Sequence, residues 1–173
     1  ASQVPNEESL AVADVIIAEP DLASLYIKSC SQLKWLQSTW AGNNKLQAVD
    51  KKDYILTGVK GVFGLQMVEY ILSYLLYFTR RIEDFNQLKL NKQWSQLPCK
   101  TLSEYEIGIM GLGSIGMQVA NRLADFGMKV NGLSRGTKQA PDVTQYTYDE
   151  LGAFLENCDF VCNLLPETSA TKG

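Results

Sequence analysis

The chain has 173 residues, of which 46% are hydrophobic and 20% are charged. This apolar content is enough for a packed core and excludes a disordered chain. The formal net charge is −3 and the pI is about 5.0, so we expect no binding to nucleic acid or to an anionic membrane. There is no histidine, which excludes histidine metal ligands and histidine acid–base catalysis within this chain.

The four cysteines are Cys30, Cys99, Cys158 and Cys162, and only the last two are close in sequence. This spacing lacks the paired hooks of a structural zinc site, so we expect no metal and reduced thiols, as in a cytoplasmic protein. The first residues show no signal peptide, and the longest apolar stretch, residues 65–78, is too short to span a bilayer.

The N-terminal part of the chain predicts a parallel sheet covered by helices. Residues 12–18 (VADVIIA) are almost wholly apolar, which favours a strand buried on both faces. Residues 34–39 and 54–57 predict two further strands, and residues 21–30 predict a helix capped by Asp21. The alternation of strand and helix favours parallel pairing.

An apolar stripe with helical spacing predicts one long helix over residues 65–90. At about 1.5 Å per residue this helix would be roughly 39 Å long. Such a helix could bridge two domains, or it could be an ordinary core helix, and the pattern leaves both possibilities open. Residues 91–100 predict a linker.

A glycine-rich motif, GLGSIG at residues 111–116, follows a predicted strand at 106–110. A predicted helix comes directly after it, and another strand at 128–133 completes a unit of about 30 residues. This context is typical of a dinucleotide-binding βαβ unit, whereas a glycine turn without a ligand is the alternative.

Each glycine of the motif has a distinct role in such a unit. Gly111 allows the tight turn, Gly113 lets the backbone approach a pyrophosphate, and Gly116 lets the helix pack closely on the sheet. The free amides and the dipole of the helix start stabilise phosphate charge. We therefore predict that the cofactor contacts the whole turn: Gly111, Leu112, Gly113, Ser114, Ile115 and Gly116.

The remaining signals lie after this unit. Gly127 is placed as a left-handed helix C-cap, and residues 147–150 (TYDE) form a capping box before another helix. Residues 160–165 predict a third strand, which Pro166 ends. Residues 101–104 (TLSE) match the capping-box pattern too, but a strand follows them, so we discount that match. Three strands are about half of a complete Rossmann domain.

The segment after the second strand of the unit, SRGTK at residues 134–138, indicates which cofactor is preferred. An NAD site has an acidic residue here to bind the ribose 2′-hydroxyl, and this segment has none. The Arg135 guanidinium can grip a 2′-phosphate, and Ser134 can add a hydroxyl donor. We therefore predict that NADPH is preferred and that NADH remains possible; the alternative is that Arg135 is simply an exposed loop residue.

Four stretches together resemble the D-isomer-specific 2-hydroxyacid dehydrogenases, and most of all their NADPH-dependent glyoxylate/hydroxypyruvate reductase branch. These stretches are WLQSTWAG at 35–42, GVFGLQMVEY at 61–70, IGIMGLGSIG at 107–116 and NLLPET at 163–168. They occur in the order and spacing of that family.

The resemblance implies an α/β protein with two domains and an active site in the cleft between them. A partial flavodoxin-like substrate domain would cover residues 1–64, and an interdomain helix and linker would cover residues 65–100. Residues 101–173 would be the first half of a Rossmann-type, doubly wound parallel sheet.

The resemblance also implies positions for the site. The family's loop that takes the substrate carboxylate on backbone amides falls on Trp40, Ala41 and Gly42. A further cofactor contact falls on Leu165 and Pro166. The family's substrate-binding arginine and its His–Glu acid pair have no match in this chain, so we assign no catalytic residue and expect a fragment that is inactive alone.

The implied activity of the parent protein is NAD(P)H-dependent reduction of a small 2-oxo acid, such as glyoxylate or hydroxypyruvate, to a D-2-hydroxy acid. A homodimer is the family's usual form. Two alternatives remain open at this point. One is a dinucleotide-sensing, corepressor-like binding protein, and the other is a dehydrogenase of the phosphoglycerate type.

Overall fold

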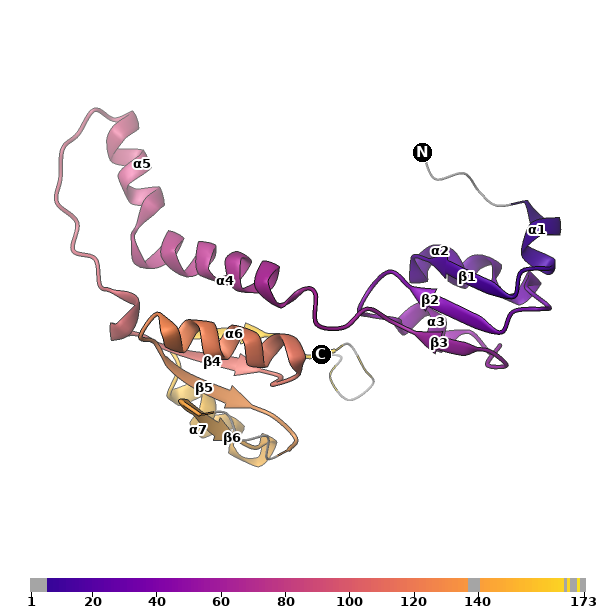
Figure 1. The fold of residues 1–173 in the computed structure, drawn as a ribbon. Helices are drawn as coiled ribbons and strands as arrows, with labels where there is room; N and C mark the ends of the chain where they lie inside the picture. The colour runs from indigo at the N-terminus through magenta and orange to yellow at the C-terminus, as the bar shows by residue number, and fades with distance from the viewer. Residues whose placement is uncertain (1–5, 137–140, 167, 169–170, 172–173) are drawn as a thin grey trace. The chain divides into compact units, whose positions relative to one another are not determined.

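The computed structural model describes residues 6–136, 141–166, 168 and 171 (Figure 1). The chain divides into two compact units. The first consists of Ala1–Lys60 with Pro166–Gly173, and the second consists of Gly61–Leu165. No helix among the described residues has both the length and the apolar character needed to cross a membrane.

The first unit is built on a parallel sheet of three strands in the order β1-β2-β3. The strands are β1 (Val15–Ala18), β2 (Trp35–Ser38) and β3 (Ile55–Thr57). The accompanying helices are α1 (Glu7–Ala11), α2 (Pro20–Tyr26), η1 (Ile27–Ser29) and α3 (Asn44–Ala48). Their apolar side chains and those of one sheet face form the core of this unit, centred on Ile27, Leu36 and Leu46.

Two predictions for this unit are wrong in detail. The strand predicted over residues 12–18 begins only at Val15, because Val12 ends α1, which the side chain of Asn6 caps by accepting the Glu8 amide at 3.1 Å. This strand is also not buried on both faces, since Val15 and Ile17 are exposed.

The helix predicted over residues 21–30 begins one residue earlier, and Glu19 rather than Asp21 is its N-cap residue. Pro20 occupies the first turn, where a missing amide hydrogen costs nothing. The helix ends at Tyr26 and continues as the short η1 turn, so the predicted element is present but divided.

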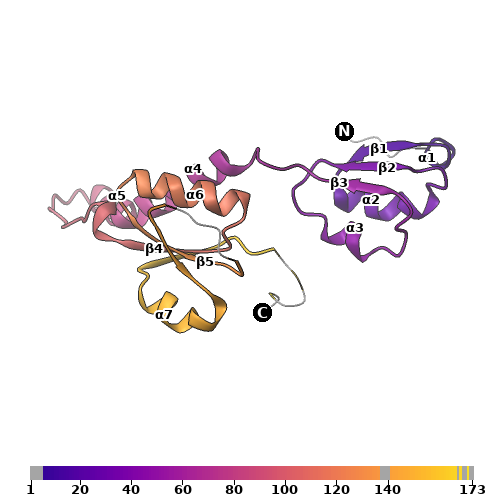
Figure 2. The same ribbon diagram turned by 60° about the horizontal axis from the view of Figure 1, so that its bottom comes forward.

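The second unit contains a parallel sheet of four strands in the order β6-β5-β4-β7. The strands are β4 (Glu106–Met110), β5 (Lys129–Leu133), β6 (Val143–Tyr146) and β7 (Phe160–Asn163). The helices α6 (Ser114–Asp125) and α7 (Leu151–Glu156) cover opposite faces of the sheet (Figure 2). This is the arrangement of the first half of a doubly wound Rossmann sheet.

The prediction of three strands in this region is wrong, because β6 is a fourth. Its residues are VTQY, which include strand-favouring types but form a segment too short and too polar to stand out in the sequence. It forms because β5 offers it a parallel partner from Val130 to Leu133. The predicted left-handed C-cap is confirmed, since Gly127 has φ of +80° at the end of α6.

The long helix predicted over residues 65–90 is two helices, α4 (Gly64–Thr79) and α5 (Ile82–Leu90). The break is at Arg81, whose φ of 53° is left-handed and cannot continue an α-helix. Within the second unit α4 packs on α6, and its buried side chains there are Val68, Ile71 and Leu75. By contrast, α5 buries none of its residues.

The capping box that we discounted at residues 101–104, just before β4, is present in the structure. Thr101 and Glu104 do form a capping box, with the Thr101 amide donating to the Glu104 carboxylate at 2.7 Å. The box closes a single 3-10 turn, η2 (Leu102–Glu104), which fits before the strand without competing with it. The capping box at Thr147 is confirmed and leads into η3 (Tyr148–Glu150) and then α7. All four cysteines are free thiols in the structure.

Candidate functional site

The glycine-rich turn joins the carboxyl end of β4 to the start of α6. Gly111 has φ of +99°, a backbone conformation that residues with a side chain rarely adopt. Its amide donates to the Leu133 carbonyl at 2.9 Å, and a β-carbon there would lie 3.1 Å from the Leu164 carbonyl oxygen. The turn is therefore attached to both neighbouring strands of β4, and only glycine fits at its first position.

The other two glycines of the turn face different surroundings. A β-carbon on Gly116 would collide with the Gly111 carbonyl oxygen, so its absence lets α6 start close to the sheet. A β-carbon on Gly113 would meet no atom within 4 Å, and its φ of −74° suits any residue. Nothing in the described part of the fold requires glycine at 113, and the role predicted for it, close approach of a ligand, stays a prediction.

The first turn of α6 supplies hydrogen-bond donors. The amides of Ser114, Ile115 and Gly116 have no acceptor inside the helix, because they belong to its first turn. No acidic side chain lies in this turn to compete for them. An anion placed here would also gain from the helix dipole.

Leu112 and Ile115 contribute backbone rather than side chains to the surface of this turn. Leu112 is buried, and its side chain fills the space that a β-carbon on Gly132 of β5 would occupy. Ile115 packs against the core of the second unit. These two side chains anchor the loop on the core of the unit, and the exposed residues of the turn are Gly113 and Ser114.

The segment after β5 lies next to this turn. The Ser134 amide donates to the Tyr146 carbonyl at 3.1 Å, and the Ser134 hydroxyl donates to the Gly136 carbonyl at 2.7 Å. Arg135 is exposed and makes no hydrogen bond or ion pair within the described part of the chain. Its guanidinium is thus available to an anionic ligand, whereas the Ser134 hydroxyl already has an acceptor. The end of the predicted segment, at 137 and 138, lies outside the described residues.

A third loop, after β7, also reaches the glycine turn. The Leu164 amide donates to the Met110 carbonyl at 2.9 Å, and the Asn163 side chain accepts the Leu165 amide at 3.0 Å. The Leu165 side chain would lie 3.2 Å from a β-carbon on Gly111. Pro166 follows and is exposed. The fold therefore gathers three loops at the carboxyl edge of the sheet, which is where open α/β sheets bind ligands.

The predicted substrate loop, Trp40 to Gly42, belongs to the first unit and follows β2. Trp40 is half exposed, and Ala41 and Gly42 are exposed. The amides of Ala41 and Gly42 have no hydrogen-bond partner among the described residues, and a β-carbon on Gly42 would meet nothing within 4 Å. These are the features that an amide site for a carboxylate needs.

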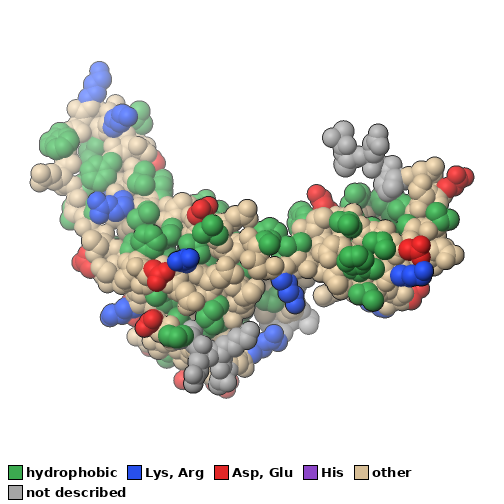
Figure 3. Space-filling view, viewed as in Figure 1, with side chains coloured by type: hydrophobic (Ala, Val, Ile, Leu, Met, Phe, Trp, Pro, Cys, Tyr) green, Lys and Arg blue, Asp and Glu red, His purple; other side chains and the backbone are tan. Residues whose placement is uncertain are grey.

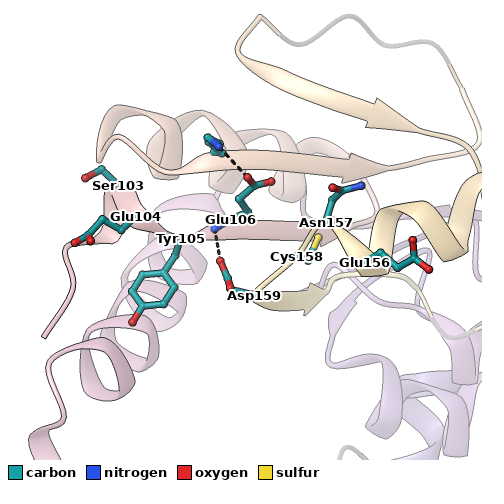
Figure 4. A pocket seen from close by; sticks show the side chains of 9 residues that line it. Ser103, Glu104, Tyr105, Glu106, Glu156, Asn157, Cys158 and Asp159 are labelled. Carbon is teal, nitrogen blue, oxygen red and sulfur yellow. Dashed lines mark hydrogen bonds and ion pairs between the residues drawn. The ribbon is translucent and has the colours of Figure 1, made fainter. Parts of the chain in front are cut away.

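A polar pocket of about 330 Å³ lies at the amino ends of the strands in the second unit, opposite the end that carries the glycine turn (Figure 4). At its centre the Glu106 carboxylate accepts from Lys129 at 2.9 Å, and the Glu106 amide donates to Asp159 at 2.8 Å. The hydrogen bond from Lys129 is the largest of the effects that lower the pKa of Glu106. The Glu106–Lys129 ion pair and the backbone bond to Asp159 join the amino ends of β4 and β5 to the segment before β7, so we interpret the pocket as a structural network.

The fold and the turn define a dinucleotide-binding βαβ unit. Residues 72–173 match the family described as D-isomer specific 2-hydroxyacid dehydrogenase, NAD binding domain. This match covers more than half of the chain, and the chain belongs to that family.

Known relatives agree with this assignment. The chain is 41% identical over 111 residues to glyoxylate/hydroxypyruvate reductase A of Salmonella paratyphi B, covering 64% of the chain and 36% of that protein. Its fold matches a 2-hydroxyacid dehydrogenase family protein from Aeromonas salmonicida with a TM-score of 0.87 and 34% identity, covering 95% of the chain and 54% of that structure.

A third relative was solved with a cofactor. The NADPH-dependent glyoxylate/hydroxypyruvate reductase of Sinorhizobium meliloti, in complex with NADP and sulfate, matches with a TM-score of 0.83 and 28% identity. It covers 92% of the chain and 51% of that structure. The chain thus spans about a third of the length of the curated relatives it matches and about half the length of these structures.

The Glu106–Lys129 pair predicts a pH dependence of stability. Folding lowers the pKa of Glu106, so the pair stabilises the fold above the unfolded-state pKa of about 4.3, and this contribution is lost as the pH falls through the lower, folded-state value. Glu106→Gln should therefore lower the free energy of unfolding at pH 7, and the difference from the unaltered chain should be smaller at pH 3. Urea unfolding at both pH values measures this.

The matched control is Glu156→Gln, in the same pocket, where no ion pair is lost. That variant should unfold like the unaltered chain at both pH values. A Glu106→Gln effect of equal size at pH 3 and pH 7 would contradict the role given to the pair.

Proposed function

We propose that the protein containing this chain binds NADP(H) at the glycine turn and reduces a small 2-oxo acid of the glyoxylate or hydroxypyruvate type to a D-2-hydroxy acid. The observation that carries the proposal is the turn itself, in which open space at Gly113 adjoins the unpaired first-turn amides of α6. Family membership and the names of the relatives support the reaction.

The residues present fit a phosphorylated dinucleotide. The pyrophosphate would take the amides of the turn, and the free guanidinium of Arg135 would bind a 2′-phosphate. When bound, the nicotinamide supplies the hydride. The relatives solved with NADP or NADPH support this preference over NAD.

The substrate carboxylate would bind the amides of Ala41 and Gly42. We assign no proton donor among the residues of this chain, which has no histidine. The sensing and phosphoglycerate-type alternatives are less favoured, because curated relatives from Salmonella are named as glyoxylate/hydroxypyruvate reductases. Four free thiols support a reducing compartment such as the cytoplasm.

A homodimer is part of this proposal. Figure 3 shows hydrophobic side chains over the helices α4 and α5. We use the name α4–α5 apolar face for the large exposed side chains on these two helices and just after them: Tyr70, Tyr74, Phe78, Phe85, Leu90 and Trp94. Trp94 is 92% exposed, and a nine-residue helix such as α5 is marginal unless it is packed. A second copy would offer the same face, as a two-fold contact requires.

Gly113→Ala tests the cofactor site. The added methyl group meets no protein atom, so the melting temperature should not change, but it enters the space proposed for the pyrophosphate. We expect NADPH to bind about tenfold more weakly, which corresponds to about 1.4 kcal/mol. Fluorescence titration measures the affinity. Gly152→Ala, which adds a methyl group in open space on α7, should bind NADPH normally. Unchanged affinity in Gly113→Ala would refute the site.

Arg135→Asp tests the choice of cofactor. Replacing the guanidinium by a carboxylate should weaken NADPH about a hundredfold, because it removes an ion pair and adds repulsion, and should affect NADH far less. The KM values of both cofactors for glyoxylate reduction measure the difference. Arg122→Asp, in the last turn of α6, also reverses an exposed charge and should leave the ratio of the two KM values unchanged. An equal rise in the KM values of both cofactors would overturn the assignment of Arg135.

Tyr74→Glu tests the dimer. A charge on the α4–α5 apolar face should convert the dimer to a monomer, because burying an unpaired carboxylate is costly. Sedimentation equilibrium measures the mass. Leu25→Glu, which replaces an exposed leucine in the first unit, should leave the dimer intact. An unaltered protein that is already monomeric at micromolar concentration would contradict the proposal.

A further inference from the structure

Ser38 is a buried polar residue at the last position of β2, directly before the substrate loop. Its exposure is 0%, and a buried hydroxyl is costly unless it is hydrogen-bonded. Two other buried polar residues of the described chain lie in the second unit. Thr79 donates to the Leu75 carbonyl one turn earlier in α4, and Asn131 donates to the Asn157 carbonyl. Both hydrogen bonds of the Ser38 side chain go to a single residue, Trp40.

These two bonds fix the peptide groups of Trp40. The Trp40 amide donates to the Ser38 hydroxyl oxygen at 3.1 Å, and the same hydroxyl lies 3.2 Å from the Trp40 carbonyl oxygen, which accepts from it. The Val59 amide also donates to the Trp40 carbonyl, at 3.3 Å. One end of the loop is thus held by three hydrogen bonds, while the next two amides, those of Ala41 and Gly42, have no partner among the described residues.

Gly58, just after β3, packs against the same loop. A β-carbon on Gly58 would lie 2.9 Å from the Asn43 side-chain nitrogen and 3.3 Å from the Trp40 carbonyl oxygen. The loop is therefore bounded by backbone on this side, with no side chain at 58 to push it away. Ser38 and Gly58 thus constrain the Trp40 end of the loop, which carries the Ala41 and Gly42 amides as donors without a partner among the described residues.

We infer that Ser38 is a positioning residue for substrate binding. By fixing the Trp40 peptide groups, it holds the Ala41 and Gly42 amides in one arrangement before a carboxylate arrives, so that binding does not have to order them. This inference rests on the proposed function, because it takes the substrate to be a 2-oxo acid whose carboxylate meets these amides. Preorganisation of this kind affects substrate affinity and leaves the cofactor loop of the other unit untouched.

Ser38→Ala in the protein containing this chain is the central experiment. We expect the KM for glyoxylate to rise about tenfold, the KM for NADPH to stay the same, and kcat to change by no more than about twofold. Ser38→Thr keeps the hydroxyl and should restore most of the glyoxylate affinity. The control is Ser24→Ala in α2, whose hydroxyl also bonds to a backbone carbonyl but outside the loop. An unchanged KM for glyoxylate, or an equal rise in both KM values, would overturn the inference.

A binding measurement separates this inference from the proposed function and does not depend on turnover. In protein labelled with 15N, glyoxylate should shift the amide resonances of Ala41 and Gly42, and Ser38→Ala should need about tenfold more glyoxylate for the same shift. Shifts without NADPH-dependent reduction would support the site and refute the reaction. Reduction without shifts at these two amides would support the reaction and refute the role of Ser38.

Discussion

The second unit depends on one constraint, the close approach of α6 to the end of β4. The Gly111 amide is bonded to Leu133 of the neighbouring strand, and Gly116 lies so near the Gly111 carbonyl that no side chain fits between them. These contacts bring the start of the helix against the carboxyl edge of the sheet, where its unpaired amides and its dipole act together. Without that approach the amides would be directed at bulk water rather than gathered beside the segments that follow β5 and β7.

The same edge explains why separate segments of sequence meet. In a parallel sheet the carboxyl ends of neighbouring strands lie together, so the loops after β4, β5 and β7 adjoin although up to about 50 residues separate them. The Asn163 side chain orders the third of these loops, and Leu112 anchors the first on β5. The polar pocket at the amino ends of the strands contains the Glu106–Lys129 ion pair and makes no contact that this arrangement needs.

Local signals made the glycine turn, the Gly127 cap and the Thr147 capping box predictable, because each depends on residues within one or two turns of chain. The strand β6 was missed because its four residues are too few to form a recognisable pattern, and pairing with β5 stabilises it. The break at Arg81 was hidden because the apolar stripe continues past a change in one backbone angle. Ser38 was missed for a similar reason: in sequence it is one serine among several, and only burial and its two bonds to Trp40 distinguish it.

Leu112 has two functions that cannot be separated. Its backbone belongs to the turn proposed to bind the cofactor, while its side chain is packed into the sheet against Gly132. Occupancy and folding of this unit are therefore thermodynamically linked, because any loosening of the sheet also disperses the amides of the turn. A nucleotide present at a hundred times its dissociation constant would add about 2.7 kcal/mol to the unit's resistance to unfolding. A higher concentration of the cofactor in the cell would therefore also increase the stability of the fold.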